Sequence, residues 1–252
     1  YSLLTTHYLV KHFGLIGYPL THSFSKKYFG DKFQRENIAD CVYENFPLVS
    51  VVEFPVLIQS QKDIIGLNVT IPYKESVMSF LDEIDETARE IGAVNTIRIS
   101  DGKLKGFNTD VYGFMQSIMK LLEPHHNNAL ILGTGGSSKA VAWSLKKMGI
   151  DFQFVSRHPS GIDEISYEVA NADIRHCKII INTTPVGMYP LVTAAPDISY
   201  ENITPSHLLF DLIYNPEETL FLKKGKARQA KTKNGLEMLQ LQAERSWQIW
   251  NT

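Results

Sequence analysis

The chain has 252 residues, 44% of them hydrophobic, so it is long enough to bury one large core or two ordinary ones. Lys and Arg number 25 against 27 Asp and Glu, a net charge of −2, and no basic run interleaved with aromatic residues indicates a nucleic-acid surface. No apolar stretch approaches a membrane span, and the N-terminus lacks the pattern of a secretory signal. We therefore expect a cytoplasmic protein, monomer or homodimer, that acts on a small molecule without a nucleic-acid or membrane partner.

Strand-sized apolar runs alternate with helical stretches along the chain, which predicts an α/β fold with mostly parallel sheets. Apolar residues at three- and four-residue intervals predict helices in "SFSKKYFGDKFQREN", "SSKAVAWSLKKMG" and "NGLEMLQLQAERSWQIW". The expected strands are residues 13–17, 41–46, 64–71, 93–99, 129–133, 152–156, 178–184 and 208–214.

The segment "EPHHNN" (123–128) has the most linker-like composition of the chain and indicates a domain boundary near residues 108–128. The two cysteines, Cys41 and Cys177, lie in separate apolar runs without the spacing of a metal site. We therefore predict two domains with a cleft between them, packing cysteines and no metal.

The first strand runs into "LTHSFSKK", where Ser23 and Ser25 precede or open a helix. One serine is explained as a helix N-cap. The pair could instead present two hydroxyls to a polyol or a carboxylate, and the sequence leaves both interpretations open.

In "GLNVTIPYKESV", Asn68 and Thr70 share one side of a strand by alternation, and the apolar residues share the other. The strand has apolar flanks and is expected to be central, so its buried amide and hydroxyl need partners, which a bound polyol could supply. Pro72 ends the strand, and Lys74 follows where a helix would begin, a place that the helix dipole makes unfavourable for a cation. An ordinary solvated lysine is the alternative.

Two further segments have the same polar character at strand ends. "GAVNTI" places Asn95 beside Thr96, and "GFNTDVYGF" places Asn108, Thr109 and Asp110 at the entry of a helix. Capping and the helix dipole also explain Asp110, so spacing alone does not decide its role.

The stretch "NALILGTGGSSKAVAWSLKKMG" reads as a strand, a glycine turn and an amphipathic helix. Gly133 and Gly135 occupy the first two positions of the G-x-G-x-x-G/A fingerprint, which brings a pyrophosphate to a helix N-terminus, and Ser138 occupies the third. An ordinary strand-to-helix turn is the alternative. The motif predicts a dinucleotide site.

The next strand ends with Ser156 and Arg157 and offers no Asp or Glu for a ribose 2′-hydroxyl. An arginine favours a 2′-phosphate, so the expected cofactor is NADP, with His158 as a possible further contact. The alternative is that Arg157 is a solvated loop residue.

"INTTPVGM" ends a later strand with small polar groups, including Thr183, that would face the ribose or nicotinamide of the cofactor. Met188 would then be an apolar neighbour of the nicotinamide ring. A plain turn explains this segment equally well.

Taken together and in order, these motifs resemble one family. "GLIGYPLTHSFS", "NVTIPYK", "GAVNTI", "GFNTDVYGF", "GTGGSSKA", "NTTPVGM", "DLIYNPEET" and "NGLEMLQLQA" are similar to the motifs of shikimate dehydrogenases, from about residue 13 to the C-terminus. The resemblance implies reversible NADPH-dependent reduction of 3-dehydroshikimate to shikimate, in the chorismate pathway to aromatic amino acids. It implies a substrate-binding domain of residues 1–108 plus 236–252 and a Rossmann-like NADP-binding domain of residues 109–235.

The resemblance also implies roles for individual residues, with Lys74 and Asp110 as the catalytic pair. Substrate ligands would be Ser23 and Ser25 for the carboxylate, Asn68, Thr70, Asn95 and Gln242 for the ring hydroxyls, and Tyr214 nearby. Cofactor ligands would be Gly133, Gly135, Gly136, Ser156, Arg157, Thr183, Met188, Gly235 and Met238. Ser156 and His158 depart from the family, in which many members carry Asn and Thr there.

Reduction of a ring ketone needs a hydride at carbon and a proton at oxygen, and NADPH supplies the hydride. The Lys74 ammonium can stabilise the developing alkoxide and donate the proton, while Asp110 would orient the ammonium and share the proton. Two other functions remain open: a quinate/shikimate dehydrogenase using NAD, against which Arg157 argues, and a non-catalytic binding or regulatory homologue, against which Lys74 and Asp110 argue.

Overall fold

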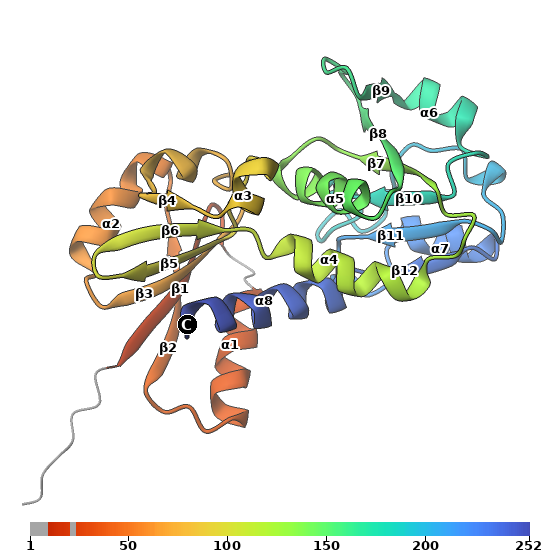
Figure 1. The fold of residues 1–252 in the computed structure, drawn as a ribbon. Coiled ribbons are helices and arrows are strands. Elements are labelled where there is room, and N and C mark those ends of the chain that lie inside the picture. Colours follow the sequence, from red (N-terminus) through yellow and green to blue (C-terminus); the bar gives the residue numbers. More distant parts are fainter. Residues whose placement is uncertain (1–9, 21–23) are drawn as a thin grey trace, which may run out of the picture. The chain divides into compact units, whose positions relative to one another are not determined.

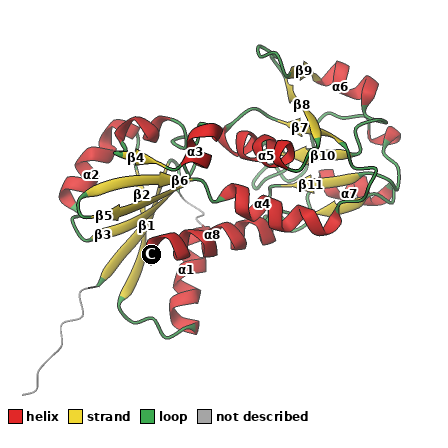
Figure 2. Cartoon of the chain, viewed as in Figure 1, coloured by secondary structure: helices red, strands yellow, loops and turns green. Residues whose placement is uncertain are grey.

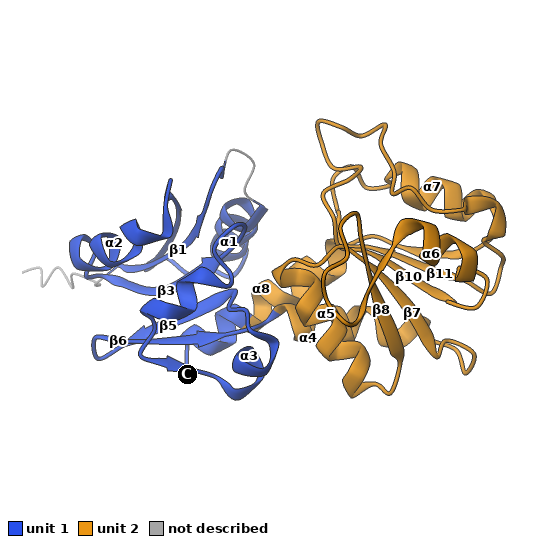
Figure 3. Cartoon of the chain, turned by 90° about the horizontal axis from the view of Figure 1, so that it is seen from above, with its two compact units in different colours: residues 1–109, 246–252 blue, residues 110–245 orange. Residues whose placement is uncertain are grey.

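The computed structural model describes residues 10–20 and 24–252, and the chain divides into two compact units. Unit 1 comprises residues 1–109 and 246–252, and unit 2 comprises residues 110–245 (Figure 3). Each unit contains a six-stranded sheet covered by helices, so the predicted α/β class with two domains is confirmed (Figures 1 and 2).

The sheet of unit 1 is mixed, with the strand order β2-β1-β3-β5-β6-β4. Strand β5 runs antiparallel to both of its neighbours, β3 and β6, whereas the other pairs are parallel. Strand β3 lies between β1 and β5, as its apolar flanks predict. The strands are β1 (Lys11–Gly17), β2 (Cys41–Pro47), β3 (Ile64–Val69), β4 (Glu83–Ile84), β5 (Thr96–Ser100) and β6 (Lys103–Phe107).

Helices cover the sheet of unit 1 on two apolar faces. Aliphatic residues such as Leu67 and Ile97 fill one core, whereas rings such as Phe13 and Phe29 fill the other, where they meet Trp247 and Trp250 of the last helix. The helices of unit 1 are α1 (Phe24–Arg35), η1 (Val51–Glu53), α2 (Phe54–Ser60), η2 (Ser76–Phe80), α3 (Glu86–Ile91) and, from residue 246 on, the end of α8 (Leu236–Trp250).

The sheet of unit 2 is parallel at every pairing and has the order β12-β11-β10-β7-β8-β9. Counted from β7 as the first strand, this is the order 6-5-4-1-2-3 of a doubly wound dinucleotide-binding fold. Its strands are β7 (Asn128–Leu132), β8 (Asp151–Ser156), β9 (Glu164–Ser166), β10 (Ile179–Asn182), β11 (Leu208–Asp211) and β12 (Lys231–Lys233).

Two apolar cores sandwich this parallel sheet, so its central strands are buried on both faces. Ile131 and Ile181 belong to one core and Leu130 and Ile180 to the other, as strand alternation requires. The helices of unit 2 are α4 (Asp110–Ile118), η3 (Met119–Leu121), α5 (Gly136–Lys147), α6 (Tyr167–Asp173), η4 (Tyr200–Asn202), α7 (Leu220–Ala227) and the first ten residues of α8.

Several local predictions need correction. The short strands β4, β6, β9 and β12 were not predicted, and the expected strands 64–71 and 208–214 end at Val69 and Asp211. The linker-like residues 123–128 lie inside unit 2, where His125 and His126 both contact the Ser206 carbonyl. The chain passes between the units at residues 109–110 and again at 245–246 within α8.

Cys41 and Cys177 are buried free thiols whose pKa is raised to about 11 by burial, which agrees with a packing role. No helix in the described ranges is both long and apolar enough to cross a membrane.

Candidate active site

Lys74 lies in a turn between β3 and η2, two residues before this 3-10 helix begins. The sequence predicts that a helix begins at Lys74, but the short 3-10 helix η2 begins at Ser76, so this prediction is wrong and the helix-dipole argument does not apply to Lys74. The Lys74 side chain is partly exposed, and its backbone carbonyl accepts a 2.7 Å hydrogen bond from the Val94 amide. The turn is thus tied to the segment before β5.

The next residue, Asn95, binds Thr109, which directly precedes α4. The Asn95 side-chain oxygen accepts the Thr109 amide at 2.7 Å, and its Nδ2 donates to the Thr109 hydroxyl at 3.0 Å. Asp110, which is buried and is the first residue of α4, follows Thr109 directly. Two consecutive residues, 94 and 95, therefore bind the backbone of Lys74 and of Thr109, the residue that precedes Asp110.

Asn68 is the centre of a buried polar network in unit 1. Its Oδ1 accepts from the Tyr43 hydroxyl at 2.8 Å, and its Nδ2 faces the Ser246 hydroxyl at 3.0 Å and the Thr96 hydroxyl at 3.3 Å. The protein itself thus supplies partners for this buried amide, and a bound polyol is not needed to satisfy it. We find no hydrogen bond of the partly exposed Thr70 hydroxyl within the described part of the chain.

Ser25 extends the network toward the first helix. It is buried in the first turn of α1 and forms a hydrogen bond with the Tyr43 hydroxyl. Because the Tyr43 hydroxyl donates its own hydrogen to Asn68, Ser25 is the donor in the bond between Ser25 and Tyr43. Burial raises the pKa of the Tyr43 phenol, which keeps it neutral and able to donate. Ser23 lies outside the described residues.

Ser246 brings the last helix into the same network. Its hydroxyl lies 2.7 Å from the Thr96 hydroxyl and 3.2 Å from the Thr109 hydroxyl. Earlier in α8, within unit 2, Met238 and Gln242 are buried, and the Gln242 Nε2 donates to the Leu239 carbonyl. The network joins Ser25, Asn68 and Asn95, three of the predicted substrate ligands, through Tyr43, Thr96, Thr109 and Ser246.

The predicted phosphate loop of unit 2 follows β7, and α5 begins at Gly136 with Gly135 as its N-cap. Gly133 has φ of +108°, and a Cβ there would lie 2.9 Å from the Thr183 hydroxyl, so both conformation and space require glycine. At the third fingerprint position, the buried Ser138 donates its hydroxyl to the Gly135 carbonyl at 2.5 Å. A serine thus fits where the fingerprint usually has Gly or Ala.

The phosphate loop lies at the switch point of the sheet, where the strand order reverses between β7 and β10. The Thr183 amide and hydroxyl both donate to the Leu132 carbonyl, at 3.0 and 2.7 Å, which joins the ends of these two strands. Ligands of such sheets bind in the crevice beyond the strand ends at this point. The residues present therefore fit a dinucleotide.

Ser156 ends β8, and its hydroxyl accepts the His158 amide at 3.2 Å. Arg157 and His158 are exposed. An exposed guanidinium beyond the strand next to the phosphate loop can meet a 2′-phosphate, and it agrees equally with a solvated residue.

Three further predicted residues follow strands of unit 2: the cofactor ligand Met188 comes after β10, the substrate ligand Tyr214 after β11 and the cofactor ligand Gly235 after β12. Met188 is exposed, whereas Tyr214 is partly buried, which raises the pKa of its phenol. The Gly235 amide donates to the Ile213 carbonyl at 3.0 Å, and a Cβ at Gly235 would collide with the Leu212 carbonyl. Gly235 thus allows the chain to pass directly beside residues 212–214.

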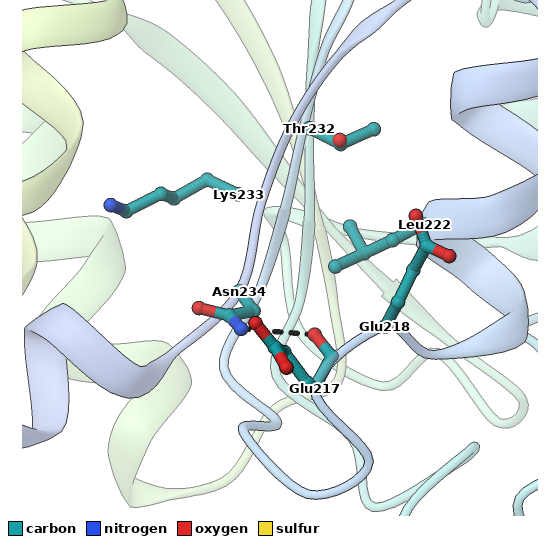
Figure 4. A pocket seen from close by; sticks show the side chains of 6 residues that line it. All are labelled: Glu217, Glu218, Leu222, Thr232, Lys233 and Asn234. Carbon is teal, nitrogen blue, oxygen red and sulfur yellow. Dashed lines mark hydrogen bonds between the residues drawn. The ribbon is translucent and has the colours of Figure 1, made fainter.

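A cavity of about 460 Å³ in unit 2 lies beside this passage (Figure 4). Asn234 donates to the Glu217 carbonyl across it at 2.9 Å, while Lys233 points away and pairs with Glu237. None of the residues predicted from the sequence lines it, so we do not place the active site there. Its lining residues are Glu217, Glu218, Leu222, Thr232, Lys233 and Asn234.

Known proteins share this arrangement. A family model described as the shikimate dehydrogenase substrate binding domain matches residues 15–97. A curated relative from Methanococcus vannielii, named shikimate dehydrogenase (NADP(+)), is 38% identical over 94% of this chain and 90% of its own length. The chain belongs to the shikimate dehydrogenase family. The predicted resemblance is thereby confirmed.

Similar solved structures have the same fold. Shikimate 5-dehydrogenase from Thermus thermophilus, in complex with NADP(H) and shikimate, gives a TM-score of 0.85 at 29% identity, covering 95% of this chain and 93% of that one. A ligand-free 5-ketofructose reductase of Gluconobacter sp. strain CHM43 gives 0.80 at 29% identity, covering 95% and 92%. The fold therefore also occurs with another named substrate, and the roles of single residues stay predictions.

Sequence reasoning missed four members of the unit 1 network. Thr96 and Thr109 stood in the family motifs but received no role. Tyr43 and Ser246 had weaker signals: Tyr43 is a hydroxyl-bearing residue on the inward side of β2, and Ser246 lies on the buried stripe of α8 between Ala243 and Trp250. In unit 2, Asn182 is one of the small polar groups of "INTTPVGM", and Asp211 lies in "DLIYNPEET" without a predicted role.

Proposed function

We propose that this chain catalyses the reversible NADPH-dependent reduction of 3-dehydroshikimate to shikimate. Family membership and the curated relatives named for NADP(+) support the reaction and the cofactor. The observation that carries the proposal is the tether at residues 94 and 95, which holds the backbone of Lys74 and of Thr109 through hydrogen bonds of 2.7 Å.

In this proposal unit 2 binds the cofactor, and the substrate ligands belong to unit 1 except for Tyr214 and Gln242, which belong to unit 2. Ser23 and Ser25 bind the carboxylate, and Asn68, Thr70, Asn95, Gln242 and Tyr214 surround the ring. The assignment agrees with the network, because Ser25, Asn68 and Asn95 belong to one connected set of hydrogen bonds. A preformed network lowers the entropic cost of ordering the side chains around a ligand.

On the cofactor side, the glycine turn and the α5 N-terminus would hold the pyrophosphate, and Arg157 the 2′-phosphate. Ser156, Thr183, Met188, Gly235 and Met238 would line the remainder. When bound, NADPH supplies the hydride. The protein's own part is to orient the ring, to donate the proton and to neutralise the oxygen that becomes charged.

Lys74 would donate that proton from its ammonium to the carbonyl oxygen, and in the reverse direction its neutral amine would accept the hydroxyl proton. Asp110 would accept a hydrogen bond from the ammonium and so hold it in place. Binding and orientation alone cannot supply this proton, which is why the pair is the chemical centre of the proposal.

The test measures NADPH formation from shikimate and NADP+ by the wild-type chain, by Lys74→Ala and by Lys62→Ala, an exposed lysine used as the control. We expect turnover in the wild type and the control, and a kcat lower by at least about 10²-fold in Lys74→Ala, with a modest change in KM. A Lys74→Ala variant that keeps wild-type turnover would refute the catalytic assignment, and a wild type without turnover would refute the function.

A further inference from the structure

A fully buried carboxylate lies at the end of β11 without a role in the chemistry above. The Asp211 Oδ1 accepts from Asn182 Nδ2 and from the Ile213 amide, both at 3.0 Å, and its Oδ2 accepts from the Thr219 hydroxyl at 2.6 Å. All three donors are neutral groups. Burying a carboxylate with only neutral partners is costly for folding, which indicates a specific function for this group.

The carboxylate decides which way the Asn182 amide faces. Burial raises the pKa of Asp211 to about 6, so at neutral pH the group is ionised and can only accept hydrogen bonds. Asn182, itself fully buried, must therefore point its NH₂ at Asp211. Its oxygen is left to accept the Thr184 amide at 3.1 Å and the Thr184 hydroxyl at 2.6 Å.

This amide orientation shapes the loop after β10. The Thr184 hydroxyl, whose hydrogen goes to Asn182, accepts the Val186 amide at 3.2 Å, and Asn182 Nδ2 also donates to the Val186 carbonyl at 3.2 Å. The same loop packs on the phosphate turn, because Thr183 and Thr184 lie within 3.0 Å of the place that a Cβ at Gly133 would occupy. Residues 183–188 thus depend on Asp211 through one intermediate side chain.

Asp211 holds the neighbouring segment on its other side. Its bond to the Ile213 amide fixes residues 212–214, and the Ile213 carbonyl in turn accepts the Gly235 amide. Its second oxygen anchors Thr219, which caps the N-terminus of α7. Two segments that carry predicted nicotinamide-end residues, 183–188 and 235, therefore depend on one carboxylate, the second of them through residues 212–214, which carry the predicted substrate ligand Tyr214.

We propose that Asp211 is a positioning residue for the nicotinamide end of the cofactor, which it serves by fixing the Asn182 amide and the loops on either side without touching the ligand. This inference rests on the proposed use of NADP+. It predicts that Asp211 matters for the nicotinamide half of the molecule and not for the adenosine half. Arg157 lies beyond β8, and the glycine turn after β7 packs against Thr183 and Thr184 but makes none of these hydrogen bonds.

A general contribution to stability is the competing explanation, and the same strand offers a control. His207 precedes β11 at the opposite edge of the sheet, is fully buried, accepts the Thr204 amide at 3.1 Å and contacts the Ile174 carbonyl at 3.0 Å. Its replacement removes a buried polar side chain whose hydrogen bonds go to Thr204 and Ile174 and not to the loops held by Asp211. His207→Gln is therefore the matched variant for Asp211→Asn.

The experiment measures the binding of two ligands by calorimetry to the full chain: NADP+, and 2′-phospho-ADP-ribose, which has the same adenosine and phosphates but no nicotinamide. In Asp211→Asn we expect NADP+ affinity to fall about tenfold, as for one hydrogen bond to a charged group, while 2′-phospho-ADP-ribose binding stays within about twofold. His207→Gln should change neither affinity by more than about twofold, whatever its melting temperature.

Equal loss of both ligands in Asp211→Asn, or no loss of either, would overturn the inference. If that variant does not fold, Thr184→Val tests the same chain of hydrogen bonds at the partly exposed Thr184. It removes the hydroxyl that donates to Asn182, so it should weaken the binding of NADP+ but not of 2′-phospho-ADP-ribose. Binding needs no turnover, so a wild type that binds NADP+ but does not oxidise shikimate would contradict the proposed function and leave this inference standing.

Discussion

The two units carry buried polar networks at the ends of their central strands, and the networks differ in charge. In unit 1, neutral hydroxyls and amides surround Asn68, whereas in unit 2 the network centres on the Asp211 carboxylate. A neutral network satisfies its own members and can hold ligand-facing groups in place at little electrostatic cost. A carboxylate accepts only, so it also dictates the orientation of its neighbours.

This difference between the units implies that most substitutions in one unit affect different kinetic parameters from substitutions in the other, which variants can test. Changes in unit 1 should alter shikimate parameters or the chemical step, and changes in unit 2 should alter cofactor parameters. Three residues of unit 2 are exceptions: Asp110 belongs to the proposed catalytic pair, and Tyr214 and Gln242 are proposed substrate ligands.

The largest effect is expected from Asp110→Asn, because an amide cannot share the proton of Lys74. We expect kcat to fall by about 10²- to 10⁴-fold with little change in either KM. Steady-state kinetics and the melting temperature are measured together. If Asp110 served only the N-terminus of α4, the melting temperature would fall while kcat persisted, and that outcome would remove it from the catalytic pair.

The second effect concerns pH and the stability of the Asp211 network. Burial raises the pKa of Asp211 from 3.8 to about 6, so between these values the folded chain holds a proton that the unfolded chain has released. Stability contributed by this group therefore falls as pH rises through that window, by about 3 kcal/mol, and stays lower above it. Tyr200, whose pKa is raised by burial and by the charge of Asp211, remains neutral there.

Urea unfolding of the wild type and of Asp211→Asn across this pH range measures the effect, and the stability difference should shift in favour of the variant as pH rises. His207→Gln offers the opposite sign: burial lowers the pKa of His207, so its contribution is lost as pH falls. Parallel pH curves for wild type and Asp211→Asn would contradict the raised pKa.

A smaller effect is expected at the 2′-phosphate. Arg157→Ala should raise KM for NADP+ about tenfold, the size of a charge-assisted hydrogen bond, and leave KM for NAD+ unchanged. Arg175→Ala, another exposed arginine of unit 2, is the control. An unchanged ratio of kcat/KM for NADP+ to kcat/KM for NAD+ would show that Arg157 is a solvated loop residue and not a cofactor ligand.

The smallest effect is expected at the substrate carboxylate. Ser25→Ala should raise KM for shikimate about fivefold through the loss of one hydrogen bond, with kcat and KM for NADP+ nearly unchanged. Ser79→Ala, an exposed serine of unit 1, is the control. A loss confined to kcat would argue against carboxylate binding, and Tyr43→Phe would then show whether Ser25 acts through its tyrosine partner.

Sequence reasoning could predict the features that local pattern determines. The alternation of strands and helices indicated the class, and the strand–turn–helix at Gly133 indicated the nucleotide-binding half, because periodicity and glycine conformation are local properties. The antiparallel placement of β5 and the pairing of β4 with β6 were missed, because those strands are short and their pairing depends on partners distant in sequence.

Site residues that lie in sequence motifs could be predicted, whereas residues that join the site only through buried contacts in the folded chain could not. Asn68 was recognised as a buried amide needing partners, but its partners Tyr43 and Ser246 lie 25 and 178 residues away. Asp211 stands in the "DLIYNPEET" motif among apolar residues, and its role depends on contacts with Asn182 and Thr219 that spacing does not reveal.

The most direct test of the whole account measures initial rates of the wild-type chain with shikimate, quinate and 5-ketofructose as substrates. Each substrate is combined with the NADP and with the NAD form of the cofactor, oxidised or reduced as the direction of the reaction requires. We predict that shikimate with NADP+ gives the highest kcat/KM. A higher kcat/KM for quinate with NAD+, a preference for 5-ketofructose with NADPH, or no turnover with any of these combinations would contradict it.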